Sequence, residues 1–199
     1  MPTSRARRAH TVALVARVAG AVLAAGSGTR MGTPKAELVV DGERLLDRAI
    51  CALFDGGCAP VLAVVRAATA APHATGVINP DPSRGMRSSL ALALDALEEV
   101  DALLLLLVDL PGVRADAVEA VAAAWQPGRI AVATYAGRRG HPIVMAPTLW
   151  RAALAVAGPD EGARALLHAR PELVDAVDVA GDPVDLDTPD DVRRWGTRS

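Results

Sequence analysis

A glycine-rich stretch near the N-terminus holds the residue types that bind phosphate. Residues 26–35 read GSGTRMGTPK, and Lys35 is the only lysine among the 21 basic residues of the chain. Glycines let backbone N–H groups approach an anion closely, and such a loop forms an anion nest. Arg30 adds a planar pair of donors and Lys35 a compact charge. The stretch indicates a phosphate site, although an ordinary glycine-rich turn between a strand and a helix has a similar composition.

The spacing of this stretch differs from that of two common nucleotide-binding motifs. A dinucleotide fingerprint, G-x-G-x-x-G, would need a third glycine at Met31, and no Gly-Lys-Ser/Thr follows as in a P-loop. An NAD-dependent oxidoreductase is therefore disfavoured, although it stays among the alternatives.

Aspartates at two places could bind a metal ion. Asp109 follows seven apolar residues, 102–108, where a carboxylate is costly without a partner. The partner could be a helix N-terminus or a hard cation such as Mg²⁺, which prefers oxygen ligands. Asp185 and Asp187 alternate along an extended segment and point to one side. Either of them could complete a metal site with Asp109.

Apolar runs alternate with helix-length amphipathic stretches, which predicts the elements that position these residues. The chain is expected to form strands at 18–24, 60–65, 102–108, 129–134 and 173–179. Helices are expected at 45–54, 88–100, 116–125, 148–156, 160–168 and 188–195, the second opening with a Ser88 cap and the last with proline at its first position. Residues 79–85 and 135–141 are expected to be loops.

This alternation predicts an α/β fold with a mostly parallel sheet between helix layers. The apolar run 102–108 shows no alternation, which is typical of a central strand covered on both faces. Ligands of such sheets bind at the carboxyl ends of strands. The loops after residues 24, 65, 108 and 134 are therefore the expected positions of the chemistry.

Composition narrows the class of protein. With 199 residues, of which 51% are hydrophobic and 22% charged, the chain has the size of one domain. We expect a basic flexible tail at 1–15 and a single domain at 16–199. A net charge of −2 does not suggest a nucleic-acid partner, and no apolar run is long enough for a membrane span.

The basic start followed by an apolar run also resembles an export signal, but Arg17 interrupts that run, so a cytoplasmic protein with two reduced cysteines is favoured.

Several segments together resemble one family, the molybdenum cofactor cytidylyl- and guanylyltransferases of the MocA/MobA-like group. The stretch 23–35, LAAGSGTRMGTPK, is similar to the signature loop of nucleotidyltransferases with a Rossmann-like fold. The later segments that match the family in order are NP at 79–80, GMRSSL at 85–90, DLP at 109–111, GRRGHP at 137–142, DEGARALL at 160–167 and DLDTPDD at 185–191.

The resemblance implies a three-layer αβα nucleotidyltransferase fold and transfer of a nucleoside monophosphate from an NTP to a phosphorylated acceptor. It implies catalytic roles for Lys35, Arg30 and Asp109, with Mg²⁺ held by Asp109 and Asp187. The nucleotide would be bound by residues of the first loop and of the segment 79–88, namely Leu23, Ala24, Ala25, Gly26, Ser27, Gly28, Thr29, Gly32, Asn79 and Ser88. The acceptor phosphate would meet Arg138, Arg139 and His141, unless these form only a solvated basic turn.

The resemblance also implies a choice of base and acceptor. Ala25 stands where the guanylyl branch tends to carry glycine, so CTP is favoured over GTP. The expected reaction is transfer of CMP to the phosphate of a molybdopterin-type cofactor, with a molybdoenzyme as a further partner. A sugar phosphate or isoprenoid phosphate acceptor, or a non-catalytic relative that binds and delivers a cofactor, are the alternatives.

Overall fold

The structure is a computed structural model that describes residues 16–67, 69–158 and 161–197. The predicted tail, residues 1–15, lies outside the described residues. None of the helices in the described part has the length and apolar character needed to cross a bilayer.

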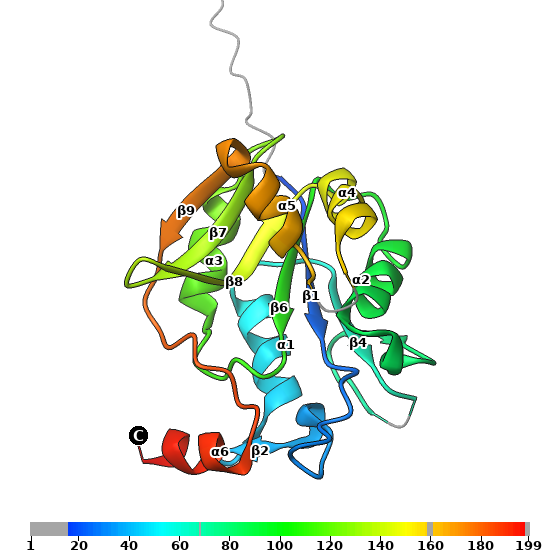
Figure 1. Cartoon of the computed structure of the whole chain (residues 1–199), viewed down its shortest axis with the longest axis vertical. Helices are drawn as coiled ribbons and strands as arrows, with labels where there is room; N and C mark the ends of the chain where they lie inside the picture. The colour runs from blue at the N-terminus through cyan, green and yellow to red at the C-terminus, as the bar shows by residue number, and fades with distance from the viewer. Residues whose placement is uncertain (1–15, 68, 159–160, 198–199) are drawn as a thin grey trace, which may run out of the picture.

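The described part of the chain is built around one seven-stranded sheet (Figure 1). Its strands, in spatial order, are β5 (Thr75–Ile78), β4 (Val61–Val65), β1 (Val18–Leu23), β6 (Ala102–Leu107), β8 (Arg138–Met145), β7 (Ile130–Tyr135) and β9 (Val174–Asp178). Strand β8 runs antiparallel to both of its neighbours, β6 and β7. All other neighbouring strands of the sheet are parallel. A small separate hairpin consists of β2 (Val39–Val40) and β3 (Glu43–Arg44).

Helices cover both faces of this sheet, which confirms the predicted α/β architecture. The first face carries α1 (Leu45–Asp55) and α3 (Ala115–Ala124), and the second carries α2 (Met86–Asp95), α4 (Pro147–Val156) and α5 (Arg164–Ala169). The C-terminal helix α6 (Pro189–Gly196) packs on the first face at its edge. Three short 3₁₀ turns complete the elements, namely η1 (Lys35–Glu37), η2 (Pro82–Arg84) and η3 (Pro171–Leu173).

The leucine run of β6 is the centre of the core, as its composition predicts. Leu103 and Leu105 pack in the cluster on the second face, and Leu104 and Leu106 in the cluster on the first. All four are at most 1% exposed. A strand that alternates between two cores needs apolar residues on both sides, so it shows no polar alternation.

Four predictions about local structure are wrong. The helix expected at 160–168 begins only at Arg164, because residues 161–163 form a turn. Residues 135–141 are not a loop but part of a hairpin, because β7 and β8 join at Ala136 and Gly137, which both have positive φ. Two such residues form the tight turn that matches the twist of paired strands. Helix α2 begins at Met86 with Gly85 as its cap, so Ser88 lies inside the helix and donates from its hydroxyl to the Gly85 carbonyl at 2.8 Å. The same helix ends at Asp95, five residues before the predicted end.

Candidate functional site

The carboxyl ends of β1 and β6 lie side by side, and the segments that follow them carry the predicted phosphate and metal residues. The two strands are parallel and in register up to Leu23 and Leu107. The glycine-rich loop continues from β1, and Asp109 follows β6. A third segment, residues 179–188 between β9 and α6, reaches the same edge, where the Leu186 N–H donates to the Asp109 carbonyl at 2.9 Å. We refer to this third segment as the strap.

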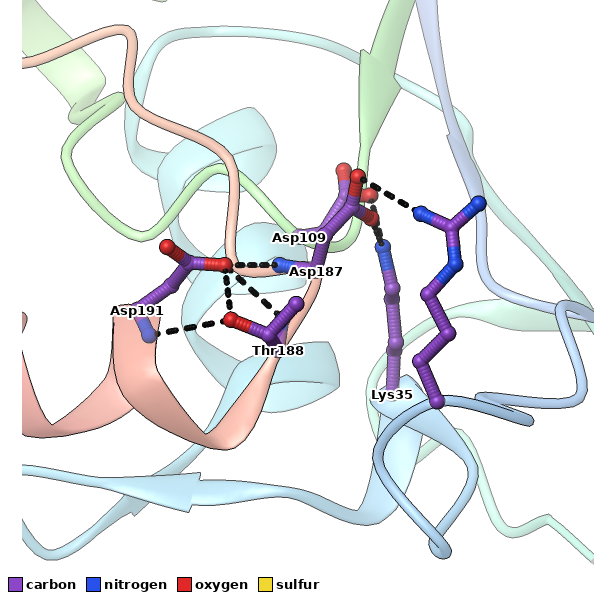
Figure 2. A network of polar contacts seen from close by, with 6 residues as sticks. Lys35, Asp109, Asp187, Thr188 and Asp191 are labelled. Atoms are coloured by element: carbon purple, nitrogen blue, oxygen red, sulfur yellow. Dashed lines mark hydrogen bonds and ion pairs between the residues drawn. The ribbon is translucent and has the colours of Figure 1, made fainter.

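Lys35 is the point where the three segments meet (Figure 2). Its Nζ donates a hydrogen bond of 2.7 Å to Oδ2 of Asp109 and a second hydrogen bond to Oδ1 of Asp187. Burial disfavours the ammonium charge, but the two carboxylates outweigh burial, so the pKa of Lys35 lies above its ordinary value. The structure therefore brings together a charged lysine and two aspartates that the sequence places up to 152 residues apart.

Asp109 retains one oxygen with no partner. Its side chain is 18% exposed, and its Oδ1 is buried without a hydrogen bond among the described residues. A buried carboxylate oxygen without a donor is costly, and it is the kind of atom that a hard divalent cation binds. The described residues contain no group of three or more acidic, histidine or cysteine side chains placed to hold a metal ion.

Asp187, rather than Asp185, faces Lys35. Leu186, between them, is fully buried and fixes the strap against the sheet, whereas Asp185 is exposed. The Asp187 N–H donates to Oδ2 of Asp191 at 3.3 Å, and Thr188 and Asp191 form a capping box at the start of α6. Hydrogen bonds from Thr188, more than any other contact, hold the pKa of Asp191 below its ordinary value. The helix start that the sequence predicts thus also orients the neighbouring Asp187.

The glycine-rich loop is folded back on itself beside this cluster. Gly28 has φ of +62°, and a Cβ there would lie 1.9 Å from the carbonyl oxygen of Thr33. Arg30 reaches Asp187 at 3.8 Å, but its side chain is 77% exposed. Such an arginine can turn toward a bound anion without leaving a buried partner unpaired.

A cavity of about 290 Å³ lies beneath this loop. Of the nucleotide-binding residues predicted from the sequence, five line it together with Lys35 and Asp109, namely Leu23, Ala25, Gly26, Ser27 and Gly28. Ala24, Thr29, Arg30 and Gly32 do not line it. Six further residues line the cavity although no binding role was predicted for them, namely Pro82, Gly85, Met86, Ser89, Leu107 and Val108.

Asn79 and Ser88 lie behind the cavity wall instead of on it. Asn79 is 3% exposed, and its Nδ2 donates to the hydroxyls of Ser88 at 3.0 Å and Ser89 at 2.9 Å. Its Oδ1 accepts from the Asp81 N–H at 3.0 Å. The amide therefore braces the segment that carries Gly85 and Ser89 into the cavity. Direct contact of Asn79 or Ser88 with a nucleotide stays a prediction.

A second cavity, of about 360 Å³, adjoins the first, since Met86 and Leu107 line both. Of the three residues predicted to meet the acceptor phosphate, Arg139 and His141, on β8, line this cavity and Arg138 does not. Its floor is apolar, formed by side chains of β6, β7 and β8. Three polar residues with no predicted role also line it, namely Glu161, Arg164 and His168. They belong to the segment that the sequence analysis matched to the family without giving it a function.

His141 contributes no charge to the second cavity at neutral pH. Burial lowers the pKa of its imidazole to about 4. The ring is thus neutral and can form hydrogen bonds, but it cannot attract an anion as a cation would. Positive charge at this cavity comes instead from the exposed arginines Arg139 and Arg164.

Comparison with known proteins identifies relatives along nearly the whole chain. A family model described as the MobA-like NTP transferase domain matches residues 20–175. The nicotine blue oxidoreductase of Paenarthrobacter nicotinovorans is 35% identical over 194 residues, which cover 89% of this chain and 95% of that protein. This relative carries an oxidoreductase name although it matches a chain with a transferase domain.

Two solved structures of Rv0371c from Mycobacterium tuberculosis H37Rv superpose on the described fold. The first has a TM-score of 0.80 and 27% identity, and covers 92% of this chain and 99% of its own. The second, a complex with manganese, has a TM-score of 0.75 at the same identity and covers 92% and 100% of the two chains. Their fold is the three-layer arrangement described above.

Proposed function

Because the chain belongs to the MobA-like NTP transferase family and is thereby a nucleotidyltransferase, we propose that it transfers CMP from CTP to the phosphate of a molybdopterin-type cofactor, releasing pyrophosphate. The observation that carries the proposal is the cluster of Lys35, Asp109 and Asp187, of which Lys35 and Asp109 line the cavity beneath the glycine-rich loop.

In this reaction an oxygen of the acceptor phosphate attacks the α-phosphorus of the NTP. The bond from that phosphorus to the bridging oxygen of the β-phosphate breaks, and pyrophosphate leaves. Such a transfer depends on positioning and on neutralising charge. Backbone N–H groups of residues 26–32 and Arg30 hold the leaving phosphates, and Lys35 exchanges a carboxylate contact for an α-phosphate oxygen as negative charge develops there.

Mg²⁺ is the proposed metal, and Asp109 and Asp187 are the residues that would hold it. The unpartnered Oδ1 of Asp109 supports this assignment, and the manganese complex of Rv0371c shows that a relative takes a divalent ion. A divalent ion bound there supplies positive charge to phosphate oxygens.

Ala25 supports the choice of CTP. It lines the first cavity and is 2% exposed, so its methyl group takes space in the wall. A pyrimidine needs less of that space than a purine. One methyl group of misfit in a pocket is worth about 1 to 3 kcal/mol, which gives a preference for CTP of roughly 10- to 200-fold in kcat/KM.

The base assignment is tested by the Ala25→Gly variant, measured with CTP and GTP and one shared acceptor. The variant should turn over GTP better relative to CTP than the native enzyme does. A native enzyme that prefers GTP would remove the assignment to CTP while leaving nucleotidyl transfer intact.

The second cavity supports a phosphorylated acceptor with a planar ring, whose face can lie on the apolar floor while its polar edge meets the polar residues of the wall. Its floor is apolar, its arginines can meet a phosphate, and it opens beside the first cavity. A sugar phosphate or an isoprenoid phosphate would share the anionic group, and an acceptor screen separates the three. A molybdoenzyme that receives the product, and a cytoplasmic location where NTPs are abundant, belong to the same proposal.

Reduction of an aromatic compound is a second candidate, because the 35% identical relative is named nicotine blue oxidoreductase. Such a function would use the same two cavities for an electron-donating dinucleotide and a planar acceptor. The dinucleotide fingerprint is incomplete at Met31, which favours transfer over reduction.

One experiment separates the candidates. The purified enzyme is incubated with each of the four NTPs, Mg²⁺ or Mn²⁺ and the phosphorylated acceptors, and pyrophosphate is measured. In parallel, the oxidation of NADH and NADPH is followed with a quinonoid dye. Pyrophosphate release with CTP and a molybdopterin acceptor is the expected result. Dinucleotide oxidation without pyrophosphate release would establish the second candidate instead.

A further inference from the structure

Asp187 depends for its orientation on α6, which is too short to be a stable helix by itself. The helix has eight residues, and isolated helices of this length do not persist in water. Leu186 anchors the strap on one side of Asp187, and on the other side the Asp187 N–H bonds to Asp191 in the first turn of α6. A rotation of α6 would therefore carry Asp191 away and release the Asp187 backbone.

A polar contact at the far end of α6 prevents this rotation. Nε1 of Trp195 donates to Oδ2 of Asp41 at 2.9 Å, across 154 residues of sequence. Asp41 is the first residue of the turn between β2 and β3, the hairpin that follows η1, where Lys35 lies. In Figure 1, α6 lies beside β2. The contact thus ties the segment of Asp187 to the segment of Lys35.

Arg48 of α1 connects Asp41 to the segment after β6 that carries Asp109. It lies 3.7 Å from Oδ2 of Asp41, and its Nη1 donates to the Pro111 carbonyl at 3.4 Å, two residues after Asp109. Gly112 lies under the indole, since a Cβ there would be 3.0 Å from the Trp195 ring and 2.3 Å from the Asp182 carbonyl oxygen. All three segments that supply Lys35, Asp109 and Asp187 therefore meet at one polar cluster.

Given the role proposed above for Asp187, we propose that Asp41, Arg48 and Trp195 form a latch that positions Asp187 for cation and phosphate binding. None of the three lines either cavity described above, so they act through Asp187. They are positioning residues, and two of them, Asp41 and Arg48, lie outside every motif singled out in the sequence. Trp195 lies beyond the segment matched by the family model.

The latch is tested with one variant at Trp195 and two at Asp41, whose Oδ2 contacts both Trp195 and Arg48. Trp195→Phe keeps the ring and removes the N–H donor. Asp41→Gly removes the acceptor and tolerates the positive φ of this position, whereas Asp41→Asn keeps an acceptor oxygen and also tolerates it. The matched control is Trp125→Phe, because Nε1 of Trp125 donates to the Arg129 carbonyl at 3.1 Å, at the opposite edge of the sheet.

Mn²⁺ binding to the protein, followed by electron paramagnetic resonance, is the first measurement. Loss of a hydrogen bond to a metal ligand typically weakens metal binding by 10- to 100-fold. Trp195 and Asp41 act on Asp187 through α6 and do not contact it, so the lower end of that range applies. We expect Kd to rise about tenfold in Trp195→Phe and Asp41→Gly and to stay within threefold in Asp41→Asn and Trp125→Phe. An unchanged Kd in both Trp195→Phe and Asp41→Gly would overturn the latch.

Hydrogen exchange of residues 183–191 is the second measurement, and it needs neither metal nor turnover. Exchange in this segment should be faster in Trp195→Phe than in the native protein and unchanged in Trp125→Phe. If the native protein binds no Mn²⁺, the metal part of the proposed function fails, yet this exchange still decides the latch. Equal exchange in Trp195→Phe and the native protein would refute it.

Discussion

At the scale of single residues, Lys35 is the counter-charge for two aspartates before any ligand binds. Its ammonium contacts Asp109 and Asp187 together, and they keep its pKa above the ordinary value. Two carboxylates face one ammonium, so the three side chains have an excess of negative charge that Arg30 or a bound cation can offset. Removing the lysine therefore alters both the chemistry and the resting electrostatics of the site.

The Lys35→Ala variant should lose about 10²-fold or more in kcat, the usual scale for one preorganised charge, while its circular dichroism stays native. Lys35→Arg should restore only part of the loss, because guanidinium is larger and planar. Since the two aspartates then lack a counter-charge, Mn²⁺ should raise the Tm of Lys35→Ala more than that of the native enzyme. Turnover close to native in Lys35→Ala would remove Lys35 from the mechanism.

His141 makes stability depend on pH. Its folded pKa, about 4, lies below the unfolded value of about 6.5, so the unfolded state binds more protons between these values. The stability that the folded protein has with a neutral His141 ring is fully present above about pH 6.5 and is lost as the pH falls toward 4. We expect His141→Gln to flatten the decline in unfolding free energy over this range by about 1 to 2 kcal/mol.

The measurement for His141 is urea denaturation at pH 4 to 7. His73→Gln, at an exposed loop position, is the control and should leave the slope unchanged. A slope that is the same in His141→Gln and the native protein would show that the ring is not buried in its neutral form.

At the scale of elements, Gly28 is the position of the glycine-rich loop where both the available space and φ exclude a side chain. At Gly28 an added Cβ would collide with the Thr33 carbonyl, and φ is positive, whereas at Gly26 a Cβ would meet no atom within 4 Å. Gly28→Ala should weaken CTP binding at least tenfold by distorting the loop, with only a small change in Tm, because the loop is largely exposed.

Gly26→Ala separates distortion from direct contact. The added Cβ leaves the loop unstrained. A loss of CTP affinity in this variant would therefore mean that the bound nucleotide lies against residue 26. Both affinities are measured by isothermal titration calorimetry. Native affinity in Gly28→Ala would show that the loop does not hold the phosphates.

The regular elements with strong local patterns could be predicted from the sequence, and those that depend on distant partners could not. The leucines of β6 and the Thr188-Pro189 start of α6 carry their structure in their own residue types. Strand β8 was missed because it begins with two arginines and contains Pro142, and only pairing with β6 and β7 makes it a strand.

In the candidate site, too, the residues with a clear local pattern could be predicted and those that depend on distant contacts could not. Lys35, Asp109 and Asp187 were found because each follows a recognisable strand or precedes a recognisable helix, and the structure brings them together. Ser89 was missed, and Asn79, predicted to bind the nucleotide, lies outside the cavity lining, because the positions of both depend on a buried hydrogen-bond cluster. No local pattern tells which side of such a cluster faces the ligand.

At the scale of the whole molecule, ligand binding should appear as stability. A ligand present at about 100 times its Kd stabilises the folded state by about 2.7 kcal/mol, which for a chain of this size raises Tm by roughly 5 to 10 °C. We expect this rise for the native enzyme with CTP and Mg²⁺. Asp109→Asn keeps the shape of the side chain but should show less than half of the rise.

Differential scanning fluorimetry with and without EDTA measures this difference. Without ligand, the Tm of Asp109→Asn should equal or exceed the native value, since an under-partnered buried carboxylate is removed. If the variant unfolds at a much lower temperature and still responds fully to CTP and Mg²⁺, Asp109 has a structural role and the cation lies elsewhere.

The position of Asp187 in the strap has a consequence for the divergence of such chains. The glycine-rich loop and Asp109 lie within residues 20–175, which the family model spans, whereas Asp187 is encoded after them. On the role proposed for Asp187, mutation of the codons for the strap silences turnover while the glycine-rich loop is inherited intact. We expect such a lineage to include pseudoenzymes that sense or sequester nucleotides. The residue at the position of Asp187 should distinguish them from active transferases.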